Sequence, residues 1–253
     1  LACEDGPVIV VSGDYCRTPN PVCAPWEPVA CDIFVTEATF GLPVFRHPDP
    51  AAETRRLLAS MAEFPDRKHL IGAYALGKAQ RVIALLREAG YDAPIYLHGA
   101  MEKITYYYQE RGIPLGELRP ARGMKKAELA GTITLAPPSA TSDVWTRRFP
   151  DPVTAFASGW MRVRARARQG GIELPLVISD HADWDGLTAT IAATGAGEIW
   201  VTHGQEDALV HWCKSKGLAA RPLDLVGYGD EDEGETAAVT GEGEAKPDGE
   251  ATS

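Results

Sequence analysis

The sequence predicts an α/β fold, because short apolar segments alternate with amphipathic segments of helical period along the chain. Four segments are apolar and short, as buried parallel strands are, and each is followed directly by polar residues. They are residues 8–11, 33–36, 174–179 and 198–202. The composition agrees, because 45% of the 253 residues are hydrophobic and 24% are charged, which is typical of a globular protein.

Five segments between these strands have the spacing of helices. The segment 51–63 is amphipathic and has Pro50 at its first turn, where a proline is tolerated. The segment 77–89 carries apolar residues at helical spacing, and Gly90 is placed to end it. The remaining predicted helices are residues 101–111, 185–193 and 206–214.

The net charge of −10 at first argues against a nucleic-acid partner, but it is unevenly distributed. Residues 230–253 hold nine acids and one base, a charge of −8, which leaves −2 on residues 1–229. This acidic segment has no aromatic residue, so we expect a disordered tail over residues 229–253. An odd number of cysteines, five, argues against a disulfide framework. No apolar run is long enough to span a membrane, and we therefore expect a cytoplasmic protein.

Acids and histidines follow the four predicted strands. Asp14, Glu37, His181 and His203 each stand at the carboxyl end of a different strand, where ligand-binding groups of α/β folds collect. Each residue alone also fits an ordinary structural role, such as a turn former, a helix cap or a loop histidine. Together they form the set of carboxylate and imidazole ligands that a divalent metal prefers.

The order of these motifs resembles a known family. Residues 12–14 read SGD, 36–41 TEATFG, 179–184 SDHADW and 201–204 VTHG, with ALGKAQ at 75–80 and SGW at 158–160. This order resembles the metallo-β-lactamase nucleases that carry a β-CASP insertion. Among them it is most similar to the bacterial ligase-associated DNA exonucleases, also described as mRNA 3′-end processing factors. The resemblance implies a partial metallo-β-lactamase αββα sandwich (residues 1–41 and 175–228) with an inserted α/β β-CASP domain (residues 42–174).

The resemblance also implies a role for each motif residue. Asp14 matches a carboxylate that bridges two metal ions, and His203 matches a ligand of the second ion. Glu37 and His181 match a carboxylate–histidine pair beside the scissile phosphate, with His181 as the general acid. The implied cofactors are two divalent metal ions, zinc or alternatively manganese.

One departure from the family is large. The family motif HxHxDH is absent, and none of the six histidines forms an HxH pair. Asp14 and His203 alone cannot give zinc its four ligands. Since the sequence also begins with Leu1 rather than Met, we expect the C-terminal portion of a longer enzyme, inactive or nearly so by itself.

Basic residues predict a nucleic-acid surface. Arginines alternate from 162 to 168 and would share one face of a strand, either to bind phosphates or to protect a sheet edge. Trp160 is a candidate for stacking on a base and equally for the core. Lys78, at the start of a predicted helix, is either a phosphate ligand or an ordinary surface lysine. The predicted nucleic-acid-binding residues are Lys78, Trp160, Arg162, Arg164, Arg166 and Arg168.

The function expected from these features is that of a metal-dependent phosphodiesterase, a DNA exonuclease that acts on DNA ends in repair or ligation. The alternatives are an RNA-processing nuclease of the same fold and a non-catalytic nucleic-acid-binding scaffold. The expected partners are DNA or RNA ends and, by the family resemblance, an ATP-dependent DNA ligase and a helicase. No membrane partner is expected.

Overall fold

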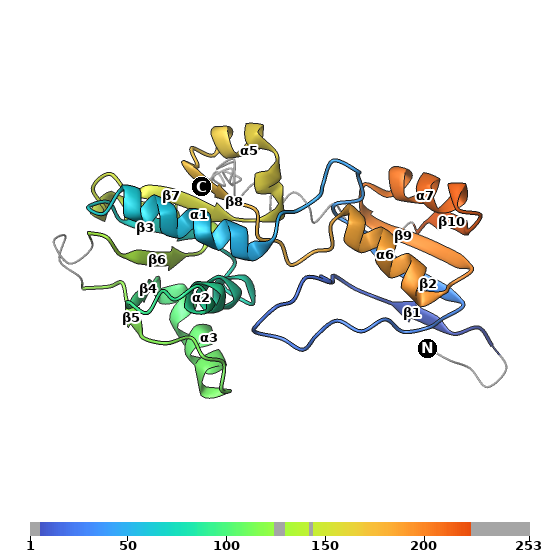
Figure 1. Ribbon diagram of the computed structural model, residues 1–253, viewed down its shortest axis with the longest axis horizontal. Coiled ribbons are helices and arrows are strands. Elements are labelled where there is room, and N and C mark those ends of the chain that lie inside the picture. Colours follow the sequence, from blue (N-terminus) through green and yellow to red (C-terminus); the bar gives the residue numbers. More distant parts are fainter. Residues whose placement is uncertain (1–5, 124–129, 142–143, 224–253) are drawn as a thin grey trace, which may run out of the picture.

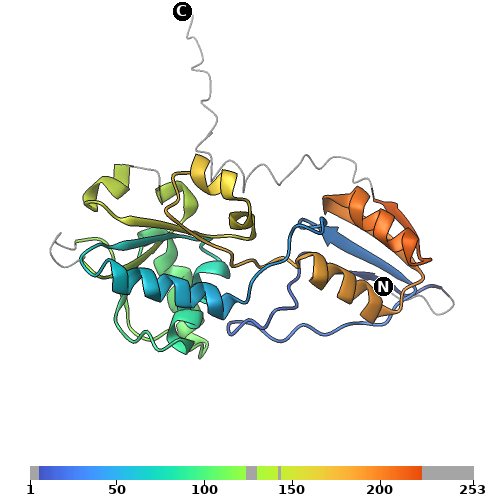
Figure 2. The same ribbon diagram turned by 45° about the horizontal axis from the view of Figure 1, so that its top comes forward.

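Two parallel sheets lie side by side in the computed structural model, which describes residues 6–123, 130–141 and 144–223 (Figures 1 and 2). In the four-stranded sheet the order is β1 (Ile9–Val11), β2 (Ile33–Ala38), β9 (Glu198–Gly204), β10 (Ala219–Pro222). In the six-stranded sheet it is β5 (Leu118–Pro120), β4 (Ile95–Leu97), β6 (Ile133–Ala136), β3 (His69–Gly72), β7 (Val153–Ala157), β8 (Leu174–Leu176). All described pairings are parallel, which confirms the α/β class.

The four-stranded sheet is assembled from both ends of the described chain. Helices α6 (Trp184–Thr194) and α7 (Glu206–Ser215) pack on one of its faces. The core there joins strand residues Phe34, Ile199 and Val201 to Leu187 of α6 and Leu209 of α7. The chain leaves this sheet after β2 and returns at α6, so the loops after β2 and before α6 both reach toward the second sheet (Figure 1).

The six-stranded sheet is covered on both faces. Side chains alternate between faces along a strand, so Ile71 and Leu70 of β3 enter different cores. Ile71 packs with α1 (Pro50–Glu63), α2 (Lys78–Glu88) and α3 (Gly99–Glu110). The other face carries α4 (Pro138–Thr141), η2 (Val144–Arg148), η3 (Gly159–Arg162) and α5 (Arg164–Gln169).

Two details of the predicted organisation are corrected. The segment 174–179 is a strand only over Leu174–Leu176, and it pairs with β7, so residues 175 and 176 lie in the six-stranded sheet. The arginine segment is not a strand, because Arg162 ends η3 and residues 164–169 form α5. Arginine and alanine are strong helix formers, and only Val163 is β-branched, so local propensity favours the helix.

The predicted acidic tail, residues 229–253, lies outside the described residues. Among the residues that are described, no helix has both the length and the apolar character needed to span a membrane.

Candidate metal and catalytic site

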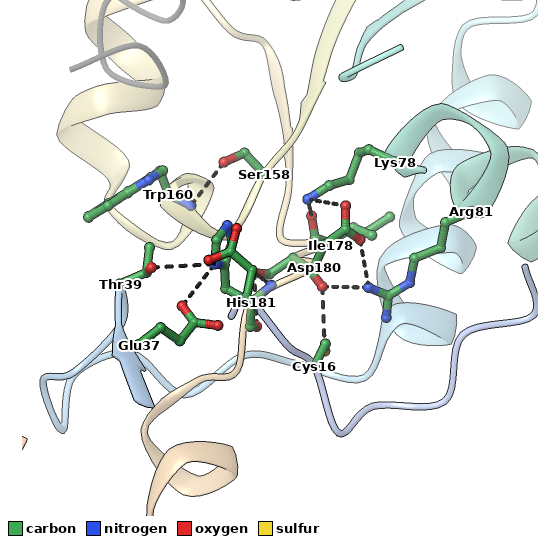
Figure 3. A network of polar contacts seen from close by, with 12 residues as sticks. Cys16, Glu37, Thr39, Lys78, Arg81, Ser158, Trp160, Ile178, Asp180 and His181 are labelled. Carbon is green, nitrogen blue, oxygen red and sulfur yellow. Dashed lines mark hydrogen bonds and ion pairs between the residues drawn. The ribbon is translucent and has the colours of Figure 1, made fainter. Parts of the chain in front are cut away.

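Two loops that follow strands and the carboxyl end of a third strand meet between the two sheets. Asp14 lies three residues beyond β1, Glu37 is near the end of β2, and His181 lies in the segment between β8 and α6 (Figure 3). The first two strands belong to the four-stranded sheet and β8 belongs to the six-stranded sheet. Three of the four side chains that were predicted at strand ends, those of Asp14, Glu37 and His181, therefore lie close together.

Glu37 and His181 form the centre of the site. Glu37 is 2% exposed, and its Oε2 lies 2.8 Å from Nδ1 of His181 while its Oε1 accepts the Tyr15 backbone N–H at 3.0 Å. Thr39 Oγ1 lies 3.3 Å from the same ring nitrogen. A carboxylate only accepts hydrogen bonds, so this contact places a proton on Nδ1 and leaves Nε2 as the nitrogen that can exchange one.

Asp14 completes a group of three potential metal ligands. Its side chain is 70% exposed, and its Oδ1 lies 3.9 Å from Nδ1 of His181. One ligand atom from each of Asp14, Glu37 and His181 lies within 4.8 Å of the other two. Two carboxylates and an imidazole fit one divalent cation, provided that the cation replaces the proton on Nδ1. Three ligand atoms fall short of the four that zinc takes in a closed site.

His203 stands beside this group without joining it. In the register of β2 with β9, Glu37 faces Thr202 and Ala38 faces Gly204, so His203 is the extra residue of a bulge. Its φ is 56°, and it is exposed. Among the described residues, the group of ligand atoms found within mutual reach does not include His203, so its ligation of a metal stays a prediction.

Two buried cations of α2 hold the loop that carries His181. Lys78 is 3% exposed, and its Nζ donates to the Ile178 carbonyl at 3.1 Å and lies 3.3 Å from Oδ2 of Asp180. Arg81, one turn later, is fully buried and donates through Nη1 to the Ser179 carbonyl and to Oδ1 of Asp180 (Figure 3). The helix start at Lys78 was predicted, but the lysine faces this loop rather than open surface.

An aromatic cluster supports the same loop from the other side. Trp160 is 6% exposed and packs against Phe40 and Phe45, with ring centroids 4.9 and 5.4 Å away. This is the core position that the sequence left open as an alternative to base stacking. Ser179 Oγ accepts the backbone N–H of His181 at 3.0 Å, which fixes the turn before the imidazole.

The predicted arginines are dispersed by the helix. Arg162, Arg164 and Arg168 are exposed, whereas Arg166 is half-buried with its guanidinium 3.8 Å from the centroid of the Trp160 ring. They do not form the single phosphate-facing row that a strand would give. Their contact with a nucleic acid stays a prediction.

Several residues of the site were not predicted as functional. Thr39, Ser179 and His47 line or support it, and Arg81 is its most buried cation. Burial lowers the pKa of His47 to about 4, so this imidazole is neutral at pH 7. Asp183 accepts the N–H groups of Gly186, at the start of α6, and of His47. The spacing of Lys78 and Arg81, three residues apart on one helix face, is the signal that could have identified Arg81.

Comparisons with known proteins find a curated relative and similar solved structures. No protein-family model matches the chain. A probable DNA ligase of Opitutus terrae is 26% identical over 212 residues, which is 83% of this chain but only 19% of that protein. A crystal structure of a protein of unknown function from Enterococcus faecalis matches with a TM-score of 0.54 and 14% identity, over 87% of this chain and 57% of that one. The chain is therefore distantly similar to a segment of a ligase-related protein, and its two-sheet fold has a counterpart among solved structures.

Proposed function

We propose that this chain is part of a metal-dependent phosphodiesterase, a DNA exonuclease that acts on DNA ends in repair or ligation. The observation that carries the proposal is the 2.8 Å contact between buried Glu37 and Nδ1 of His181, with the exposed carboxylate of Asp14 beside them. Hydrolysis of a phosphodiester needs a proton donor for the leaving oxygen and a place for divalent cations. This site offers groups for both needs.

In the proposed mechanism, His181 is the proton donor. Glu37 stabilises the protonated imidazole through Nδ1 and fixes the plane of the ring, and Nε2 delivers the proton to the leaving oxygen. Thr39 and the Ser179 hydroxyl restrain the ring and its backbone. Asp14, and by prediction His203, would hold divalent cations, which when bound would polarise the phosphate and supply a nucleophilic hydroxide.

The exposed arginines extend this proposal to the substrate. Arg162, Arg164 and Arg168 follow β7 by way of η3, on the same connection that brings Trp160 against Phe40. Phosphate contacts by such side chains would make binding fall with salt concentration. The similarity to a probable DNA ligase supports DNA over RNA as substrate and a functional link to DNA ligation, whereas an accompanying helicase is proposed from the family resemblance alone.

A non-catalytic nucleic-acid-binding scaffold is the second candidate. The observation that favours it is the incomplete metal centre, since His203 stands apart from the three grouped ligands. The sequence encoded immediately upstream of Leu1 separates the two candidates. An in-frame HxHxDH motif supports the nuclease, and its absence from an intact gene supports the scaffold.

The decisive experiment measures metal content and cleavage together. End-labelled DNA and RNA are incubated with Mn²⁺ or Zn²⁺ and the full gene product, its His181→Ala and Glu37→Gln variants, and the matched surface control Arg55→Met. We expect DNA cleavage that falls by about 100-fold or more in His181→Ala with metal content retained. Unchanged cleavage in that variant would contradict the general-acid role, and faster cleavage of RNA would move the assignment to the RNA alternative.

A further inference from the structure

A small polar cavity is lined by His181 and by residues of the loops around it. Its volume is about 50 Å³, and a buried water needs about 10–15 Å³, so it has room for about three to five waters or one tetrahedral oxyanion. Its polar lining includes Arg17, Thr18, His47, Arg81, His181 and Asp183. None of the proposed metal ligands other than His181 lines it.

Arg81, one of the lining residues, has an unsatisfied edge. The residue is fully buried, and Nη1 makes both of its printed hydrogen bonds, to the Ser179 carbonyl and to Asp180. Within the part of the chain that the structure describes, Nε and Nη2 have no hydrogen-bond partner. These two nitrogens form one edge of the planar guanidinium, the edge that binds two oxygens of a carboxylate or phosphate in parallel.

The local charges are also unbalanced. Lys78 and Arg81 are both buried and share the single carboxylate of Asp180, which is 38% exposed. Asp183, the carboxylate in the cavity wall, already accepts backbone N–H groups with both oxygens. Arg17 at the rim adds a further positive charge. Three cations thus face two carboxylates, and the surplus positive charge lies at the rim, where the exposed Arg17 favours the entry of an anion.

We propose that this cavity is an oxyanion subsite that takes one phosphoryl group, bound side-on by Nε and Nη2 of Arg81 and covered by Arg17. Its size admits a single phosphoryl group, such as a terminal phosphate. That the phosphate belongs to the end of a nucleic-acid strand rests on the proposed function, whereas the oxyanion site itself rests on Arg81 and the cavity. Asp180 and Ser179 hold the guanidinium from behind, so its orientation is fixed before the anion enters.

The experiment uses inorganic phosphate as the probe, because its binding requires neither metal nor cleavage. The Arg81 Nε–H signal in ¹H–¹⁵N spectra and calorimetry report binding at constant ionic strength, with chloride as the reference anion. We expect Arg81→Met to weaken phosphate binding by about tenfold or more, Arg81→Lys to retain part of it and Arg17→Met to lose about threefold. Arg55→Met, an exposed arginine on α1, is the matched control and should not change it.

A second arm identifies the source of the phosphoryl group. Oligonucleotides with a 5′-phosphate, a 3′-phosphate or hydroxyl ends are compared in the wild-type chain and in Arg17→Met, an exposed substitution that leaves the core intact. A preference for one phosphorylated end that disappears in Arg17→Met supports a strand-end phosphate. Phosphate binding without that preference keeps the oxyanion site and assigns it to free phosphate. Absence of phosphate binding to the wild-type chain at millimolar concentration overturns the proposal. Phosphate binding by folded Arg81→Met that is as tight as that of the wild-type chain overturns it as well.

Discussion

Gly159 lies where η3, the loop after β2 and the loop that carries His181 approach one another closely. It begins η3 after β7, and a Cβ placed on it would lie 2.6 Å from Cε2 of Phe40 and 2.9 Å from Oγ of Ser179. Cζ of Phe40 would lie nearer still, and ordinary contacts begin near 3.4 Å, so Phe40 would have to retreat by more than 0.8 Å and Ser179 by 0.5 Å. Phe40 is 1% exposed and enclosed by Phe45 and Trp160, so it has little room to do so. We therefore expect Gly159→Ala to destabilise the protein by about 1–3 kcal/mol, as overpacking of a filled core does.

The same substitution should also disturb the site, because Ser179 Oγ accepts the His181 N–H. The assay is urea unfolding followed by the ¹H–¹⁵N signal of the His181 amide in the folded variant. The control is Gly197→Ala, where a Cβ meets nothing within 4 Å and the change in stability should stay within about 0.5 kcal/mol. A Gly159→Ala variant as stable as the control, with the His181 amide unmoved, would show that the two sheets are not packed at this position as described.

Three further predictions concern buried titratable groups. The pKa of His47 is lowered by burial from 6.5 to about 4, so the unfolded chain takes up this proton first as pH falls. Stability should therefore drop between pH 6.5 and 4, by up to about 3 kcal/mol at pH 4, and pH-dependent melting of His47→Gln should lack this drop. Lys78→Met should cost about 2–4 kcal/mol in urea unfolding, because it leaves the Ile178 carbonyl without its donor and removes one cation from Asp180. Burial raises the pKa of Cys213 to about 11, so in a thiol-reagent time course Cys213→Ser should lose the slowest phase while exposed Cys23 still reacts early.

The candidate site was predictable where its residues follow regular strands. Glu37 and His181 stand next to apolar segments, and parallel strands bring their carboxyl ends to one edge of a sheet. The contact of Glu37 with His181 bridges two different sheets, and strand patterns alone cannot indicate that. It was implied by the family resemblance, and the structure contains it at 2.8 Å, while the chemical roles of both residues remain predictions.

Arg81 shows why other residues of the site could not be predicted from the sequence. On a helix, an arginine near other polar residues has the pattern of a solvated side chain. Its burial results from the packing of α2 against residues 178–181, about one hundred positions later in the chain. The strands at 118–120 and 133–136 were missed for a related reason, since segments of three or four residues are too short to show a period. The arginine segment 162–168 fits either period, and only its helix-forming composition separates them.

The position of His181 links the two sheets chemically as well as sterically. Its loop is tied to α2, on the six-stranded sheet, through the carbonyls of Ile178 and Ser179, whereas its ring is tied to Glu37 of the four-stranded sheet. A shift of one sheet against the other must therefore change the contact of Nδ1 with Glu37, because the loop is held by the six-stranded sheet and the ring by the four-stranded sheet. The same shift would alter the cavity wall that Arg81 shares with His181. A phosphoryl group that draws Arg81 and Arg17 together would restrict that shift, so occupation of the oxyanion subsite should tighten the Glu37–His181 contact that the proposed proton transfer needs.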